Sequence, residues 1–352
     1  MFHDRIRRAR VLRGLTQEAL AQRLGDISKQ GLSKFEKGES SPNSTRILQL
    51  AKALDVKPEY FFRAEAVKMA PLEFRKLARM PKYRQQQVAE QMREHLERYV
   101  ALERCFDSGE DPVRQLPPRS LHVSSVEDAE GAAQQLRSQL RIGDDAIAHL
   151  TELLEEHGIK VALLDGVNDF DGACAATDDE QHVLIALNRN RPGERMRFTA
   201  AHELGHWAME FPQNMPERQV EAACHRFAGA FLYPADKVVA DFGAHKRGRV
   251  FAAELLNAKR RYGVSMQVAL RRLKDLQLLT DAGYSAAFIE FSRNGWRTAE
   301  PEPLLAEQPR RFESLVFRGL ASDLFSPSRA AEFMQCRVDE LDPTLSQLPV
   351  PA

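Results

Sequence analysis

Two histidines four residues apart, His202 and His206, restrict the fold of this chain more than any other part of its sequence. On an α-helix, residues at that spacing lie on one face, so both imidazoles point toward the same place. They supply two ligands of a Zn²⁺ site. Glu203 lies beside them on a flanking face, where its carboxylate reaches a metal-bound water and accepts its proton. The segment therefore predicts a helix, a zinc ion and Glu203 as the general base.

Apolar residues surround the two histidines, among them Ala200, Ala201 and Trp207. The histidines therefore fall on the buried side of the predicted helix. An unpaired buried polar group costs free energy, whereas one metal ion satisfies both imidazoles at once. Two core histidines with separate polar partners are the alternative interpretation.

A catalytic zinc ion takes three protein ligands and keeps its fourth position for water. The next strongly helical stretch runs from Glu217 to Leu232 and is stopped by Pro234. Glu221 and His225 are four residues apart on it, so both can face the metal. Glu217 is a weaker third choice. Spacing alone does not decide whether Glu221 or His225 is the third ligand.

The chain carries 50 Lys and Arg residues against 50 Asp and Glu residues, but their distribution is uneven. Residues 1–63 hold 13 basic and 7 acidic residues, an excess that suits a polyanion. No apolar run approaches the roughly 20 residues of a membrane helix, and no apolar signal core follows the basic start. Four scattered cysteines form no C-x-x-C pair, which is typical of reduced thiols. We expect a cytoplasmic protein without a membrane segment.

Residues 1–63 contain the capping and helix-ending residues of a bundle of short helices. Thr16 predicts the cap of a second helix that Gly25 ends. Ser28 predicts the cap of a third helix from Lys29 to Glu36, and Gly38 ends that one. Pro42 precedes a fourth helix. Two short helices joined by a tight turn within a small basic bundle indicate a helix-turn-helix.

The N-terminal segment resembles the Cro/cI-type (XRE) DNA-binding family over about sixty residues. The resemblance rests on Gly14–Ala21, Leu24–Gly25, Leu32–Gly38, Pro42 and Leu50–Leu54. It implies a double-stranded DNA operator as partner, with Gln17 bonding a phosphate. It also implies that Lys29, Gln30 and Lys34 face base edges, for which their donors are suited. The remaining residues predicted to contact DNA are Ser28, Ser33 and Arg46.

A long amphipathic helix is predicted from Arg84 to Phe106, with an apolar stripe that includes Val88, Met92 and Leu96. We expect this stripe to form a homodimer, because Cro/cI-like domains tend to read two half-sites and need a second copy. Packing of the stripe on the chain's own second domain is the alternative. The glycine and prolines of Asp107–Ser120 predict a domain boundary.

The region from about residue 125 to 290 resembles the ImmA/IrrE-type zinc metallopeptidase domain. The resemblance rests on a helix ending in the stretch Leu153–Val161, strands around Asp171–Ala173 and His182–Asn188, the segment Arg195–His206, and the later Glu221, Phe227–Ala228, Leu232, Pro234 and Tyr262–Ser265. In this family the third ligand is a glutamate thirteen residues before the proline, which implies Glu221. His225 stands where the family usually has Asn or Asp, so a swapped or extra ligand stays open. Candidates to stabilise the oxyanion are Tyr233, His225, His245 and Arg261.

These observations predict an α+β chain in four parts. They are an all-α helix-turn-helix domain (1–63), a helical connector (64–120), a zincin-like metallopeptidase domain with a small sheet (121–290), and a helical C-terminal region with a disordered tail from Pro343 (291–352). The predicted protein is a transcription regulator with a zinc endopeptidase that cuts itself or a dedicated regulatory protein, such as a repressor or antitoxin, in response to stress. The alternative is a non-catalytic DNA-binding repressor whose zinc domain senses metal or binds a protein.

Overall fold

A computed structural model describes residues 2–63, 67–70, 80–106, 116–117, 119–165 and 169–345, with residues 342–345 as backbone alone. The chain divides into two compact units. Unit 1 consists of Met1–Pro112, Ala175–Glu180 and Glu313–Ala352, and unit 2 of Val113–Cys174 and Gln181–Phe312. The predicted α+β fold is confirmed, because helices dominate and the strands form two small sheets.

Unit 1 is helical. Its elements are α1 (Phe2–Leu12), α2 (Gln17–Leu24), α3 (Lys29–Lys37), α4 (Ser44–Leu54), the 3-10 helix η1 (Pro58–Phe62), α5 (Lys82–Glu103), α15 (Pro327–Met334), α16 (Val338–Leu345) and most of α14 (Arg311–Ala321). Residues 175–180 belong to this unit because Met69 forms an antiparallel bridge with Thr177.

The second and third helices begin and end at the capping residues that the sequence predicts. The Thr16 hydroxyl accepts the Ala19 N–H at 3.0 Å, and the Ser28 hydroxyl accepts the Gly31 N–H at 3.1 Å. Gly25 and Gly38 end α2 and α3 with φ of 78° and 74°, left-handed conformations that glycine adopts without strain. Fully buried apolar residues close the bundle: Ile6, Leu20, Leu32, Leu50 and Phe61.

The predicted connector helix is α5, and its apolar stripe is buried within one chain. Val88, Met92 and Leu96 are all 0% exposed. Helical periodicity predicts that a face is buried but does not say against what. The stripe is covered within one chain, and the homodimer stays a prediction. Buried ion pairs join α5 to α1, with Arg8 2.9 Å from Glu90 and 2.7 Å from Glu97.

Unit 2 holds the strands, except for the last two residues of β3, Ala175 and Ala176, which belong to unit 1. A three-stranded sheet has the order β2 (Ile159–Leu164), β4 (Val183–Asn188), β3 (Gly172–Ala176), in which β2 and β4 run parallel with Ile159 opposite Val183. A two-stranded parallel sheet pairs β1 (Leu121–His122) with β5 (Met209–Glu210). The helices are α6 (Asp128–Gln139), α7 (Leu150–Glu156), α8 (Gly193–Ala208), α9 (Glu217–Leu232), α10 (Ala235–Phe242), α11 (Ala252–Tyr262), α12 (Met266–Asp275) and α13 (Asp281–Arg293).

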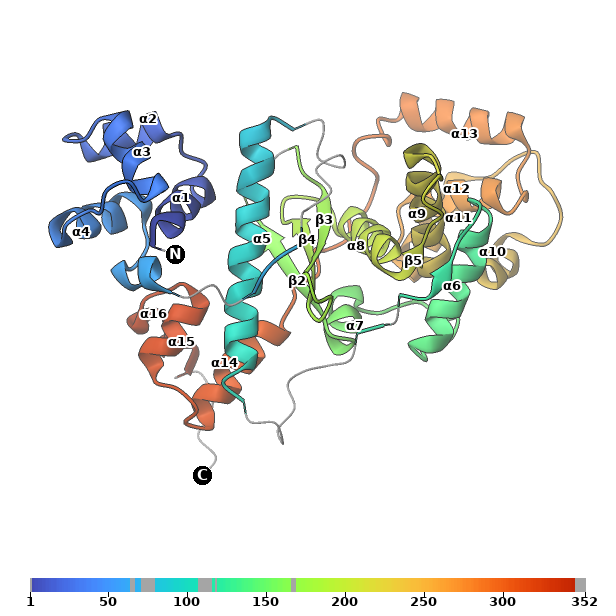
Figure 1. Ribbon diagram of the computed structural model, residues 1–352. Coiled ribbons are helices and arrows are strands. Elements are labelled where there is room, and N and C mark those ends of the chain that lie inside the picture. Colours follow the sequence, from blue (N-terminus) through green and yellow to red (C-terminus); the bar gives the residue numbers. More distant parts are fainter. Residues whose placement is uncertain are drawn as a thin grey trace. The chain divides into compact units, whose positions relative to one another are not determined.

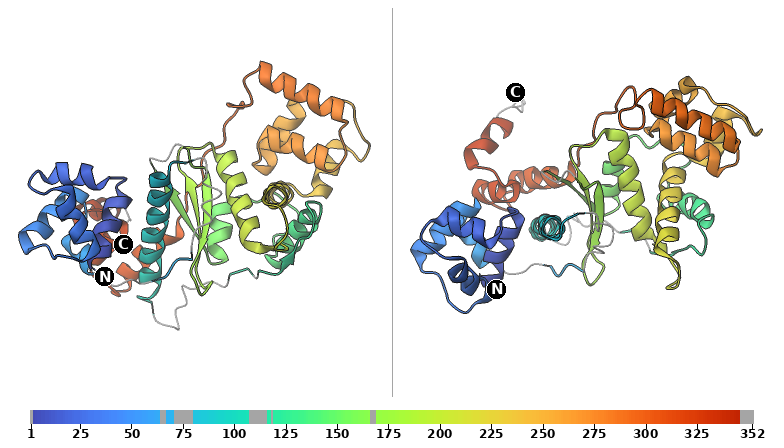
Figure 2. Two further views of the ribbon diagram at one scale, coloured as in Figure 1. Left: turned by 45° about the horizontal axis from the view of Figure 1, so that its top comes forward. Right: turned by 90° about the horizontal axis from the view of Figure 1, so that it is seen from above.

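Helices α8, α9 and α6 form successive layers beside the three-stranded sheet (Figures 1 and 2). α8 packs on β4 through its buried apolar residues, and α9 lies between α8 and α6. α9 is therefore covered on two sides, which explains its run of buried residues from Phe227 to Leu232.

The helix predicted to end in Leu153–Val161 stops earlier, at Glu156. Gly158 has φ of 79° and turns the chain into β2, which begins at Ile159. The apolar run Ile159–Leu164 is a buried strand rather than the end of a helix, because it pairs with β4 along its whole length.

The C-terminal region is helical, as predicted. α16 continues to Leu345, past Pro343, where the sequence predicts the start of a disordered tail. The rest of that tail lies outside the described residues, as does most of the predicted boundary Asp107–Ser120.

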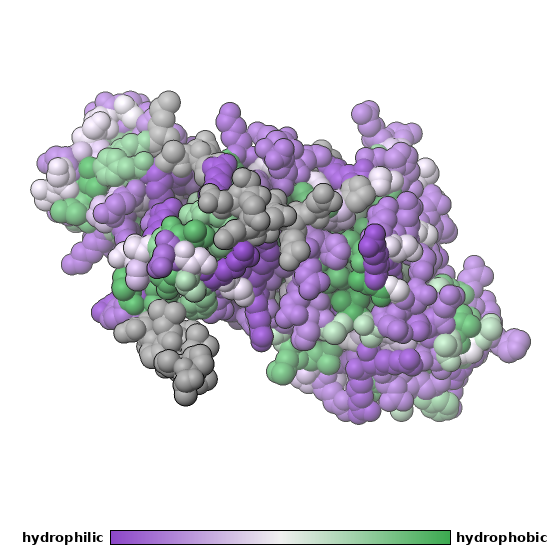
Figure 3. Space-filling view, turned by 90° about the horizontal axis from the view of Figure 1, so that it is seen from below, coloured by the Kyte–Doolittle hydropathy of each residue, from purple (hydrophilic) through white to green (hydrophobic). Residues whose placement is uncertain are grey.

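The face of the molecule in Figure 3 is mainly hydrophilic, with separate hydrophobic areas between the polar side chains. None of the helices in the described part of the chain has the length and apolar character needed to cross a bilayer.

Glu155, on α7, gives the stability of unit 2 a dependence on pH. Its side chain is buried and accepts the backbone N–H groups of Arg310 and Arg311 at 3.0 and 3.1 Å, and burial raises its pKa to about 7. Because this pKa lies above the unfolded value, the stabilising contribution is complete below about pH 4.5 and is lost as pH rises through about 7.

We expect the free energy of unfolding of Glu155→Gln to fall less between pH 5 and pH 8 than that of the parent. Tryptophan fluorescence measures it, since Trp207 and Trp296 both lie in unit 2. Equal pH slopes would contradict this assignment.

Candidate metal centre and DNA-binding surface

The close approach of α8 and α9 forms the candidate metal centre. Gly205, on α8, makes this approach possible, because a Cβ at this position would lie 2.8 Å from the Phe227 ring on α9. The fourth residue of the His-Glu-x-Gly-His segment is thus small for a packing reason. The same contact brings Glu221 of α9 beside His202 and His206 of α8.

The side-chain donors of these three residues converge. The Nε2 atoms of His202 and His206 are 3.1 Å apart. Glu221 places Oε2 3.3 Å from His202 Nε2 and Oε1 3.2 Å from His206 Nε2. A tetrahedral zinc ion with bonds of about 2.0–2.1 Å holds its ligand atoms about 3.3 Å apart. Two imidazole nitrogens and one carboxylate at these separations fit zinc in both chemistry and spacing.

Local electrostatics favour the ligand forms of these groups. Burial lowers the pKa of His202, which favours the neutral ring that binds a metal. Hydrogen bonds from His202 and His206 hold the pKa of Glu221 far below its ordinary value, so this residue is a carboxylate. The His202 ring is positioned by packing against His206 and His225, with ring centroids 4.7 and 4.5 Å away.

Glu203 is 4% exposed and faces β3. Its Oε2 accepts the backbone N–H of Cys174 at 3.0 Å. This contact fixes the carboxylate beside the two histidines that flank it on α8. The sequence gives no signal for it, because the partner is a backbone group of a strand 29 residues away.

His225 lies at the same centre. Its Nδ1 is 2.7 Å from the Glu221 carbonyl oxygen, so Nδ1 carries the proton and donates it. One ligand atom from each of His202, Glu221 and His225 lies within 4.8 Å of the others. His225 is thus close enough to act as a further ligand through the lone pair of Nε2. It can donate to a bound group only when Nε2 is protonated as well.

The other oxyanion candidates are placed differently. The Tyr233 hydroxyl is buried and donates to Asp241 at 2.6 Å, and Arg261 pairs with the same carboxylate at 3.1 Å. His245 is exposed on the loop after α10. Glu217, the weaker third choice as metal ligand, begins α9 one turn before Glu221.

The residues predicted to contact bases are exposed on α3. Lys29, Gln30 and Lys34 are solvent-exposed, and Ser33 is half-buried among them. Ser28 is also exposed, and its hydroxyl caps the helix. The surface they form can enter a major groove, which admits one α-helix.

Gln17 and Arg46 are engaged within the chain. The Gln17 amide donates to Glu36 at 2.8 Å, and Arg10 pairs with the same carboxylate at 2.6 Å. The Arg46 guanidinium pairs with Asp26, one contact being 3.0 Å, and this pairing lowers the pKa of Asp26. A DNA phosphate would have to share or replace these partners.

Comparisons with known proteins match two separate parts of the chain. Residues 6–61 match a family described as helix-turn-helix, and residues 154–274 match a peptidase family described as IrrE N-terminal-like domain. All residues of the candidate metal centre fall inside the second match.

Curated relatives match the N-terminal part. The chain is 41% identical over 59 residues to a transcriptional regulator in the ATPase CF(0) region of Rhodospirillum rubrum, covering 17% of this chain and 54% of that protein. It is 38% identical over 59 residues to the HTH-type transcriptional regulator y4wC of Sinorhizobium fredii, covering 17% of this chain and 41% of that protein. The chain thus spans about half or less of the length of these relatives. It carries a helix-turn-helix domain at residues 6–61 and an IrrE N-terminal-like domain at residues 154–274.

Proposed function

We propose that this protein is a transcription regulator that binds an operator in double-stranded DNA through α3 and hydrolyses peptide bonds at the centre between α8 and α9. The peptidase part of the proposal rests on one observation: the ligand atoms of His202, His206 and Glu221 lie 3.1–3.3 Å apart. The carboxylate of Glu203 is held beside them by the Cys174 N–H. The substrate is the chain itself or a dedicated regulatory protein, such as a repressor or antitoxin, cut under stress. Such a protein acts in the cytoplasm, where the DNA is.

The residues divide the chemistry between them. His202, His206 and Glu221 would hold Zn²⁺, which supplies a water of lowered pKa and polarises the scissile carbonyl. Glu203 would accept a proton from the attacking water and pass it to the leaving amine. The Cys174 N–H orients Glu203. We propose the doubly protonated ring of His225 as the donor to the developing oxyanion, because its Nε2–H can donate while Nδ1–H bonds the Glu221 carbonyl. Tyr233 and Arg261 are both engaged by Asp241.

A second function follows if His225 fills the fourth position of the metal. Four protein ligands make a closed site, which is the arrangement of structural and sensing zinc rather than of catalysis. The proximity of His225 to His202 and Glu221 favours this alternative over any other non-catalytic role. The His225→Ala variant separates the two functions: it weakens zinc binding if His225 is a ligand, and only slows hydrolysis if it is an oxyanion donor.

The direct test is a cleavage assay read by intact-mass spectrometry. Purified zinc-loaded protein is incubated with itself and with regulators encoded beside it, with and without a chelator. Zinc-dependent cleavage supports the proposed endopeptidase. One tightly bound zinc per chain without cleavage of any candidate would support the sensing alternative instead.

Removing Glu221 tests the choice of third ligand. We expect Glu221→Ala to weaken zinc affinity by more than about 100-fold, because even residues that only support a ligand contribute 10–100-fold. Zinc per chain, measured by elemental analysis after dialysis against a weak chelator, reports it. Glu217→Ala is the matched control on the same helix and should keep its zinc. The opposite pattern would identify Glu217 as the ligand.

Gln30 is expected to contribute to base recognition. A Gln side chain pairs with adenine through two hydrogen bonds, each such pair contributing about 1–3 kcal/mol of discrimination. Gln30→Ala should therefore weaken binding to an operator selected from random DNA by at least about fivefold, while binding to unrelated DNA stays the same. Gln22→Ala, an exposed change on α2, is the control. Equal weakening on both DNAs would remove Gln30 from base recognition.

A further inference from the structure

The beginning of α5 is rich in hydrogen-bond donors. Residues 82–87 are Lys, Tyr, Arg and three Gln, and the next acidic residue is Glu90. Lys82, Tyr83 and Gln86 are exposed, and their spacing places them on one face of the helix. Hydroxyl, amide and ammonium groups of this kind donate to the phosphate oxygens of DNA. The start of α5 therefore has the chemistry of a surface that contacts DNA.

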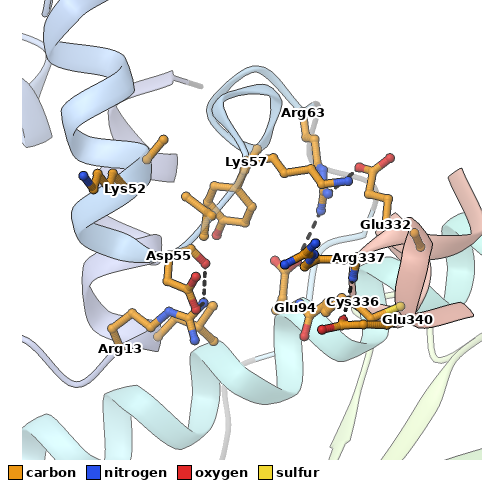
Figure 4. A pocket seen from close by; sticks show the side chains of 16 residues that line it. Arg13, Lys52, Asp55, Lys57, Arg63, Glu94, Glu332, Cys336, Arg337 and Glu340 are labelled. Atoms are coloured by element: carbon orange, nitrogen blue, oxygen red, sulfur yellow. Dashed lines mark hydrogen bonds and ion pairs between the residues drawn. The ribbon is translucent and has the colours of Figure 1, made fainter. Parts of the chain in front are cut away.

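The later part of α5 differs, because its acidic residues hold the helix-turn-helix domain in place. Arg8 of α1 lies 2.9 Å from Glu90 and 2.7 Å from Glu97. Arg63, after η1, lies 3.3 Å from Glu94 (Figure 4). All three carboxylates are buried. These ion pairs fix the helix-turn-helix domain relative to α5.

The same contact brings the start of α5 against the turn before α2. Gly14 in that turn has φ of 65°, and a Cβ there would lie 2.9 Å from the Gln87 side chain. The Gln87 amide donates to the Leu12 carbonyl oxygen at 3.4 Å. The exposed residues of α5 therefore lie close to Thr16 and Gln17, where α2 begins.

A cavity of about 440 Å³ is shared by the two surfaces. Its walls include Gln17 and Lys29 of the helix-turn-helix domain and Tyr83 and Gln86 of α5. Tyr83 is 53% exposed, and neither it nor Gln86 forms a hydrogen bond through its side chain with any residue that the structure describes. Because Gln17 is expected to bond a DNA phosphate, both residues of α5 lie at the edge of the DNA-binding surface.

The charges around this cavity suit a phosphate. Glu18 also lines it, but its carboxylate lies 3.9 Å from the Lys29 ammonium group, and both side chains are exposed. Arg10, the remaining charged lining residue, pairs with the buried Glu36 at 2.6 Å. Together with Lys82 at the start of α5, basic residues outnumber acidic ones here. A phosphate that approaches Gln17 therefore meets a net positive surface.

We propose that Tyr83 and Gln86 bind the phosphate backbone of the operator beside the Gln17 contact, so that α5 is part of the DNA-binding surface. This inference rests on the DNA-binding half of the proposed function. The Tyr83 hydroxyl and the Gln86 amide donate to phosphate oxygens, which are the same in every sequence, so both contacts strengthen binding to any duplex. Because α5 is fixed relative to α3, these contacts also set the orientation in which the duplex meets α3.

The experiment measures the affinity of the full chain for two duplexes, an operator selected from random DNA and an unrelated sequence. The test variant combines Tyr83→Phe with Gln86→Ala, two exposed changes that remove only donors and no packing. Because one hydrogen bond contributes about 2–12-fold, the double variant should bind both duplexes about tenfold more weakly, with the ratio of the two affinities unchanged. Gln22→Ala, an exposed change on α2, is the control and should leave both affinities as they are.

Ethylation of single operator phosphates locates the contact. Ethylating the phosphate beside the Gln17 contact should weaken binding of the parent but weaken the double variant no further. Ethylating the phosphate that Gln17 contacts should weaken both proteins, which also shows that the variant is folded.

The outcomes separate this inference from the proposed function. A parent that binds neither duplex contradicts the proposed DNA binding, and the inference falls with it. A parent that binds while the double variant binds equally well overturns the inference alone. Tighter binding by the variant would also overturn it, because α5 would then obstruct the duplex, and so would weakening confined to the operator, because the contacts would then be to bases.

Discussion

Replacing Glu203 by glutamine should reduce hydrolysis by about 10²–10⁴-fold while zinc binding stays at one ion per chain. Glutamine keeps the size of the side chain and can still accept the Cys174 N–H that Glu203 receives at 3.0 Å. It cannot accept a proton from water at neutral pH. The change therefore removes the general base and leaves the positions of His202, His206 and Glu221 intact.

The measurement pairs the rate of cleavage with the zinc content of the same sample. Glu290→Gln, an exposed change on α13, controls for the loss of one negative charge. Unchanged cleavage in Glu203→Gln would exclude this residue as the base. Loss of both zinc and cleavage would show instead that Glu203 supports the metal site, and the proposed division of roles would be wrong.

Much of the centre follows from the sequence because helical geometry is local. Residues four apart on a helix share a face whatever surrounds them, so the convergence of His202 and His206 is predictable. The approach of Glu221 depends on how α8 and α9 pack. Sequence spacing alone does not decide between Glu221 and His225 as the third metal ligand. Gly205 determines that packing, because it admits the Phe227 ring.

Long-range contacts are what the sequence could not supply. The partner of Glu203 is a backbone group of β3, and no side-chain pattern encodes it. The ion pairs of Arg8 with Glu90 and Glu97 join residues more than 80 positions apart. The same limitation applies to α5: periodicity predicts that its apolar stripe is buried but does not identify the surface that covers it.

Replacing Lys259 should strongly destabilise unit 2. Its side chain is 0% exposed, and its Nζ lies 2.7 Å from Glu194 and 3.1 Å from Glu300, whose side chains are 7% and 5% exposed. Both carboxylates also accept backbone N–H groups: Glu194 from Leu304, and Glu300 from Met266 and Gln267 at the start of α12. The lysine thus connects α8, α11 and the segment around residues 300–304.

Lys259→Met keeps the apolar stem of the side chain but leaves two buried carboxylates without their cation. Removing one partner from a buried ion pair costs about 3–5 kcal/mol, mainly because the remaining charge is desolvated without compensation. We expect a loss of this size in the free energy of unfolding, measured in urea by the fluorescence of Trp207 and Trp296, both in unit 2. Lys274→Met is the matched control, because that side chain is 40% exposed and its ion pair with Asp281 is worth little.

A second change separates the loss of charge from the loss of packing. Adding Glu194→Gln to Lys259→Met neutralises one of the two orphaned carboxylates, so part of the lost stability should return. Destabilisation that the second change leaves untouched would indicate that Lys259 acts by filling space. Glu194 lies on α8, eight residues before His202. If Lys259, Glu194 and Glu300 also hold this metal-binding helix in place, zinc affinity should recover together with stability.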